Sequence, residues 1–147
     1  MKAGFQYIFY CTILMALFTA CSKDGTTTDD GSGTGPHVLT PTDVTAPVIE
    51  ITTPTNNQVF TSGNMINITG KLTDDYGLYR GSITITNDAN GLVLKEQLYE
   101  IHGLVTYNFT LSYIAVVGAP ADYTVTVAFE DHGLNKTTKS VKVKVNR

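Results

Sequence analysis

The sequence contains no tryptophan and only two cysteines in its 147 residues, Cys11 and Cys21. Both cysteines precede residue 22, so no disulfide can form within the rest of the chain. No segment is repeated, and the length suits one domain behind an extended N-terminal region. A domain of about 100 residues can rely on its hydrophobic core without disulfides.

Basic residues are scarce as well. Ten Lys and Arg stand against 13 Asp and Glu, which gives a formal net charge of −3. Surfaces that bind nucleic acid or an anionic membrane carry an excess of basic residues. The composition therefore argues against both of these partners.

Signatures of catalysis are missing. The three histidines form no H-E-x-x-H pattern, no serine lies in a G-x-S-x-G elbow, and no phosphate-binding loop occurs. Glu96 and Glu100 resemble a glycosidase pair, but four residues along a strand span about 13 Å, beyond the roughly 5–9.5 Å that such pairs need. We therefore expect a non-catalytic protein, with His102 and His132 as solvated loop residues.

Residues 1–20 predict a bacterial lipoprotein signal peptide. Lys2 is the only charge, an uncharged and mostly apolar run follows, and residues 17–21, L-F-T-A-C, resemble a lipobox. Cleavage before Cys21 would leave this cysteine acylated at the start of the mature chain. The alternative is an uncleaved membrane anchor, although polar residues dilute the apolar run.

Residues 21–45 predict the lipidated cysteine and a disordered tether. This region is rich in Gly, Ser, Thr and Asp, with too few apolar residues to fold. A flexible coil of this length would hold a domain roughly 25–30 Å from the lipid on average. The sequence C-S-K-D at residues 21–24 resembles the export signal of surface lipoproteins of Bacteroidota, which implies an outer-membrane lipoprotein displayed on the cell surface. The alternative for these residues is a plain solvated linker.

Residues 46–147 predict a single all-β domain. Its strands are expected where apolar and polar residues alternate with a period of two between turn-forming residues. Seven such stretches occur, at residues 46–51, 65–73, 79–86, 92–99, 105–113, 122–131 and 141–145. A short apolar segment at Val59 and Phe60 lies between the first two. The stretch 122–131 alternates most regularly and is expected to line the centre of the core.

Two of these strands carry further expectations. The stretch 92–99 is expected to face the core through Leu92, Leu94 and Leu98. The last strand carries lysines at its flank and outer face, among them Lys142 and Lys144. Charges of this kind protect a sheet edge from pairing with another molecule, so we interpret the last strand as an edge.

Three motifs carry a family resemblance: T-A-P-V-I-E-I at residues 45–51, L-T-D-D-Y-G-L at 72–78 and A-D-Y-T-V-T-V-A-F-E-D-H-G-L-N-K at 121–136. Together they resemble the bacterial immunoglobulin-like domains of Bacteroidota lipoproteins, which include a family of unknown function. The resemblance covers residues 43–147. It implies a seven-stranded antiparallel β-sandwich in the cell envelope with Tyr123 as the tyrosine corner, and it implies no activity.

Acidic residues are expected to gather at one pole of such a sandwich. If the strands alternate up and down, the loops that carry Asp43, Asp74, Asp75 and Asp131 meet where the tether reaches the domain. Carboxylate oxygens from several loops can bind calcium. The sequence therefore predicts a weak calcium site formed by Asp74, Asp75 and Asp131 with help from Asp43. The alternative is that these acids only form turns.

These features together predict a lipid-anchored, non-catalytic module of the cell envelope. Its loops would be presented to a protein or glycan partner, because loops on a rigid scaffold commonly carry binding functions. The alternative is an architectural accessory subunit of an envelope complex.

Overall fold

The computed structural model describes residues 39–147, so the predicted signal peptide, Cys21 and most of the tether lie outside the described residues. All regular structure in the described part is β-strand. The eight strands are β1 (Val48–Thr53), β2 (Gln58–Thr61), β3 (Met65–Thr73), β4 (Leu78–Asn87), β5 (Val93–Glu100), β6 (Thr106–Ile114), β7 (Ala121–Asp131) and β8 (Lys136–Asn146). From residue 39 onward, no helix exists that could cross a membrane.

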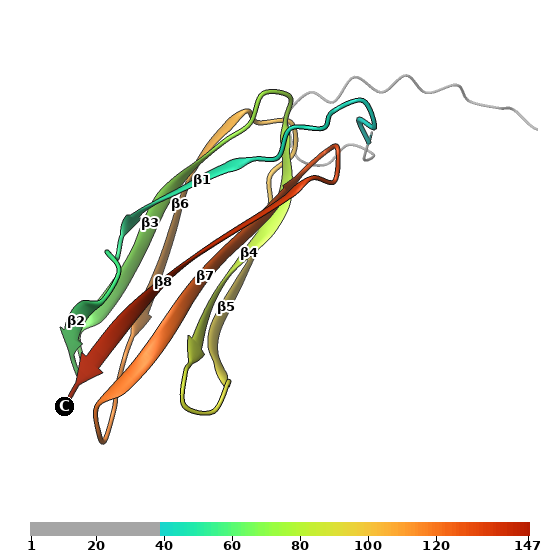
Figure 1. The fold of residues 1–147 in the computed structure, drawn as a ribbon. Coiled ribbons are helices and arrows are strands. Elements are labelled where there is room, and N and C mark those ends of the chain that lie inside the picture. Colours follow the sequence, from blue (N-terminus) through green and yellow to red (C-terminus); the bar gives the residue numbers. More distant parts are fainter. Residues whose placement is uncertain (1–38) are drawn as a thin grey trace, which may run out of the picture.

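The strands form two sheets, with the order β1-β3-β6 in one and β2-β8-β7-β4-β5 in the other (Figure 1). Apolar side chains from both sheets belong to one core. The rings of Phe109 on β6 and Phe129 on β7 are stacked at its centre, with centroids 6.4 Å apart. The predicted all-β class is confirmed, and the arrangement is that of a β-sandwich.

The most regular stretch of the sequence does line the core. Its four alternating residues, Tyr123, Val125, Val127 and Phe129, are buried on β7, between β4 and β8. The alternation predicted for β3 and β4 is confirmed too, since their inward isoleucines and leucine are completely buried. These strands were predictable because one face of each is sealed by the opposite sheet.

The prediction of seven antiparallel strands is wrong in number and in direction. The segment around Val59 and Phe60 forms an eighth strand, β2, which runs parallel to β8 from Gln58 opposite Val143 to Thr61 opposite Asn146. Four residues are too few for a clear period of two. Phe60 nevertheless packs against the core, and this contact holds the segment in the five-stranded sheet.

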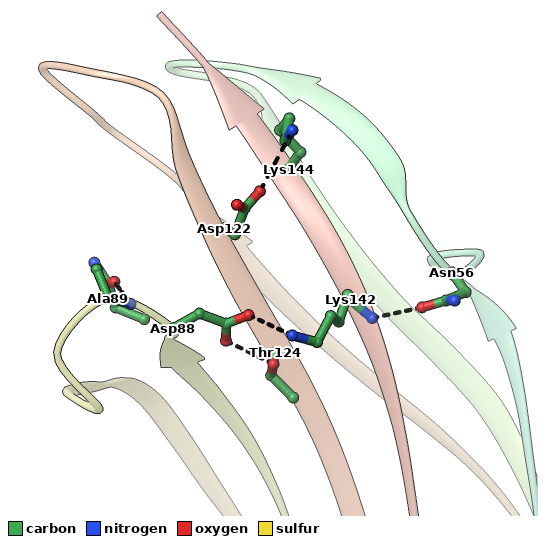
Figure 2. A network of polar contacts seen from close by, with 8 residues as sticks. Asn56, Asp88, Ala89, Asp122, Thr124, Lys142 and Lys144 are labelled. Atoms are coloured by element: carbon green, nitrogen blue, oxygen red, sulfur yellow. Dashed lines mark hydrogen bonds and ion pairs between the residues drawn. The ribbon is translucent and has the colours of Figure 1, made fainter.

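The interpretation of the last strand as an edge is wrong for its C-terminal part, where Val143–Asn146 pair with β2 on one side while β7 lies on the other. Its lysines instead form ion pairs across the sheet surface (Figure 2). The Nζ of Lys142 lies 3.0 Å from Oδ2 of Asp88, and that of Lys144 lies 3.9 Å from Oδ1 of Asp122. A hydrogen bond from Thr124 lowers the pKa of Asp88; partial burial opposes this effect, and Lys142 adds to it.

The inward face predicted for residues 92–99 is only partly correct. The register between β4 and β5 shifts between Ile85 and Thr86, as at a β-bulge. Leu94 packs against the core, whereas Leu92 and Leu98 are exposed. Beyond the shift Tyr99 turns inward, and its ring centroid lies 5.6 Å from that of Phe129.

Four connections meet at the end of the sandwich where the described chain begins, and we call this end the tether pole. They are residues 39–47, 74–77, 101–105 and 132–135. Backbone hydrogen bonds join them: Thr40 donates to His132 over 2.8 Å, His132 donates to Gly77 over 3.1 Å, and Asp74 donates to Val105 over 3.0 Å. The C-terminus lies at the opposite pole (Figure 1).

Candidate metal centre

Three carboxylates come together at the tether pole. Asp43, Asp74 and Asp75 each offer one oxygen, and these three oxygens lie within 4.8 Å of one another. Asp43 comes from the segment before β1, and the other two come from the turn between β3 and β4. Two separate parts of the chain therefore supply the acids, as expected from the up-and-down arrangement of the strands.

Asp43 is the most buried of the three, with 7% of its surface exposed. Its Oδ1 accepts a hydrogen bond from the backbone N–H of Thr45 over 3.0 Å. Its own carbonyl oxygen accepts one from Nδ2 of Asn135 over 3.0 Å, which ties the segment to the turn between β7 and β8. Its Oδ2 is buried and receives no hydrogen bond from any residue of 39–147.

Asp74 closes its own turn through one carboxylate oxygen. Oδ2 accepts hydrogen bonds from the backbone N–H groups of Gly77 over 2.6 Å and Tyr76 over 3.1 Å. Oδ1 is buried and has no donor within the described part of the chain. Burial raises the pKa of Asp74, and the negative charges of Asp131 and Asp43 add to this effect, while the two backbone donors oppose it.

Asp131, predicted to be a calcium ligand, instead accepts hydrogen bonds from Asn135. It is completely buried, and its Oδ1 and Oδ2 accept hydrogen bonds from the backbone N–H and side-chain Nδ2 of Asn135, over 2.9 and 3.0 Å. Its carboxylate thus shapes the turn between β7 and β8. It lies close enough to affect Asp74 electrostatically, but the three carboxylates that gather are Asp43, Asp74 and Asp75.

The neighbouring histidines were predicted to be solvated, and this is wrong. His102 and His132 are buried beneath the tether pole. Their ring centroids lie 5.3 and 5.0 Å from that of Tyr79 and 5.7 Å from each other. Each directly follows a buried residue, Ile101 or Asp131, because both connections fold over the end of the core. The apolar Ile101 just before His102 is the signal that the sequence offered.

Glu130, a buried acid away from the tether pole, has cationic partners and so provides a comparison for Asp43 and Asp74. Glu130, also buried, is paired with Arg80 and with Lys136, whose Nζ lies 3.2 Å from Oε2. Burial raises its pKa, but the bonds from these two cations outweigh burial, so the pKa of Glu130 is lowered. Among residues 39–147, no ion pair joins a Lys or Arg to Asp43 or Asp74.

The chemistry of the three carboxylates favours a hard cation. An unpaired buried polar atom costs about 1–3 kcal/mol, and a charged one costs more. Calcium is bound by six to eight oxygens at flexible geometry, so three carboxylates would leave positions open for other oxygen ligands. The all-oxygen donor set and the buried, unpaired oxygens both fit this ion.

The alternative glycosidase pair lies elsewhere. Glu96 and Glu100 belong to β5, opposite Thr84 and Arg80 of β4. Both side chains are exposed, and the two residues are four positions apart along the strand. Glu100 lies beside His102, with 3.3 Å between Oε2 and Nε2.

Comparison with known proteins finds no matching family model and no matching curated protein. The three carboxylates are therefore interpreted from their own geometry.

Proposed function

We propose that this chain is a lipid-anchored, non-catalytic immunoglobulin-like module of the cell envelope that binds one calcium ion at its tether pole. The single observation that carries the calcium site is the pair of buried oxygens, Oδ2 of Asp43 and Oδ1 of Asp74, without a donor or cation among the described residues. A calcium ion would supply the missing positive charge.

Strand order supports the immunoglobulin-like part of the proposal. In that fold the first, second and fifth strands share one sheet, and the last strands pair with the third in the other. If β1 and β2 are counted as two parts of the first strand, the order of both sheets agrees with this scheme. The extra strand β5 beside β4 corresponds to the one that variable-type domains add to this sheet.

The lipoprotein part rests on residues 1–21 and on the position of the tether. A chain anchored through Cys21 would approach the sandwich at the tether pole. The loops of the opposite pole would then face away from the lipid, where a protein or glycan partner can reach them.

Calcium should raise the melting temperature of the full chain. With a dissociation constant of about 10⁻⁴–10⁻³ M, as in extracellular modules, 5 mM calcium stabilises the folded state by about 1–2 kcal/mol relative to a chelator. Each kcal/mol of added stability raises the melting temperature of a domain of this size by about 4–8 °C. Thermal unfolding followed by circular dichroism, with and without calcium, measures the shift.

Variants of the acids sharpen this test. Asp43→Asn should abolish the calcium response and should raise the melting temperature in chelator, because it removes an uncompensated buried charge while an amide oxygen can still accept from Thr45. Asp122→Asn, at the opposite pole, should respond to calcium like the wild type. A wild-type melting temperature unmoved by millimolar calcium would leave these acids as turn formers only.

Lipidation is tested by the intact mass of protein extracted from membranes. The mature chain should begin at an acylated Cys21, and Cys21→Ser should accumulate as an unprocessed, unlipidated precursor. Cys11→Ser, within the predicted signal peptide, is the matched control and should be processed normally. A mature chain that begins at another residue contradicts the lipoprotein assignment.

A further inference from the structure

Exposed apolar side chains surround the acids of the tether pole. Val44, next to Asp43, is 83% exposed, and Tyr76, next to Asp75, is 63% exposed. A third group follows β5, where Leu104 and Val105 are exposed beside the turn that carries Asp74. The candidate calcium site therefore lies in an apolar rim formed by several loops.

Leu134 extends this rim at the turn between β7 and β8. It is 46% exposed and has a φ of 64°, in the left-handed region that a leucine rarely adopts. Gly133 and Asn135, which flank it, are residue types that adopt this conformation more easily. A leucine held there at an energetic cost points to a use for an apolar side chain at the tip of this turn.

A lipid anchor at Cys21, as proposed above, would bring this pole near a lipid surface. Thr40, the second described residue, is bonded to His132 at the tether pole. Eighteen residues separate Cys21 from Thr40, and a Gly/Ser-rich linker of that length would span roughly 20–25 Å on average. A lipid on Cys21 would therefore keep the rim and the acids close to the membrane that holds the anchor.

Charge explains why calcium would be required. Asp43, Asp74, Asp75 and Asp131 make the tether pole acidic, and an anionic lipid surface would repel it in the absence of a cation. A calcium ion bound by three carboxylates would offset two of these negative charges and keep positions open for further oxygens. Phosphate oxygens of lipid headgroups are ligands of this kind.

We propose that the calcium-loaded tether pole docks on an anionic phospholipid surface. Lipid phosphate oxygens complete the coordination of the ion, and Val44, Tyr76 and Leu134 enter the interfacial region beside it. Docking rests on the calcium site proposed above. It converts a loose tether into a fixed orientation, with the opposite pole pointing away from the bilayer.

The absence of tryptophan gives this proposal a direct test. Tyr76→Trp introduces a single indole at the rim. The full lipidated protein is reconstituted into vesicles of phosphatidylcholine and phosphatidylglycerol with brominated acyl chains, which quench an indole that reaches them. Calcium should cause a loss of Trp emission, and a chelator should restore it. Adding Asp43→Asn should remove the calcium response.

Val116→Trp is the matched control, since Val116 is an exposed apolar residue of the loop between β6 and β7 at the opposite pole. Its emission should not change with calcium. The docking proposal is wrong if calcium raises the melting temperature but leaves the Tyr76→Trp emission unchanged. It is also wrong if calcium quenches the emission of Tyr76→Trp and Val116→Trp equally. In either case the calcium site itself is still supported by the rise in melting temperature. If calcium also fails to raise the melting temperature, both proposals fail.

Discussion

Phe129→Ala is expected to lower the free energy of unfolding by about 3–5 kcal/mol, as for large aromatic truncations in a core. Phe129 is 2% exposed, and its ring packs between those of Phe109 and Tyr99 at the contact of the two sheets. The free energy of unfolding of a single domain is only about 5–15 kcal/mol, so this loss would remove a large part of the stability. Urea denaturation of both proteins gives the difference.

Leu98→Ala is the control, because it removes an apolar side chain of similar size from the same region. Leu98 is 68% exposed on the outer face of β5. Its truncation should change the free energy of unfolding by less than about 0.5 kcal/mol. A loss of about 2 kcal/mol or more, typical for truncation of a buried leucine, would mean that Leu98 faces the core.

Gly81→Ala should destabilise the protein through overcrowding, by about 1–3 kcal/mol or more. A Cβ on Gly81 would lie 2.3 Å from the backbone oxygen of Ala128 and 2.3 Å from Cδ1 of Phe129. The first of these atoms belongs to the backbone of the neighbouring strand, and the second lies near the base of the central ring. Neither can move without disturbing β7. Chemical denaturation measures the loss.

Gly118→Ala provides the comparison for this glycine. A Cβ at Gly118 would meet no atom within 4 Å, and the residue has no positive φ. Its replacement should be neutral or stabilise by up to about 1 kcal/mol, since alanine restricts the unfolded chain. Equal losses for the two variants would show that crowding at Gly81 is not the cause.

The sequence predicted the strands that have one sealed face and failed where this condition is missing. Ile66 and Ile83 alternate with polar neighbours because the opposite sheet buries only one side of β3 and of β4. Along the edge strand β5, the register shift beside Ile85 changes which residues face the core, so a strict period of two misplaced Leu98. A bulge of this kind leaves little trace in the residue types.

The candidate site was predictable in outline only. Turn acids were expected to converge, and Asp74 and Asp75 do meet Asp43. Asp131 lies apart from this group because Asn135 satisfies both of its oxygens, a local competition that the turn sequence did not reveal. The burial of Asp43 was hidden because its surroundings have the composition of a linker. Its position depends on bonds to Asn135, which is distant in sequence.

The pairing of β2 with β8 limits when the five-stranded sheet can be completed. β2 is the second strand in the described part of the chain, yet within that part it pairs only with the last strand, β8. Contacts between such distant parts of a chain form slowly, because a long loop must close first. The five-stranded sheet cannot be completed until residues 143–146 have left the ribosome. Until then β2 lacks the one strand with which it pairs in the described part of the chain.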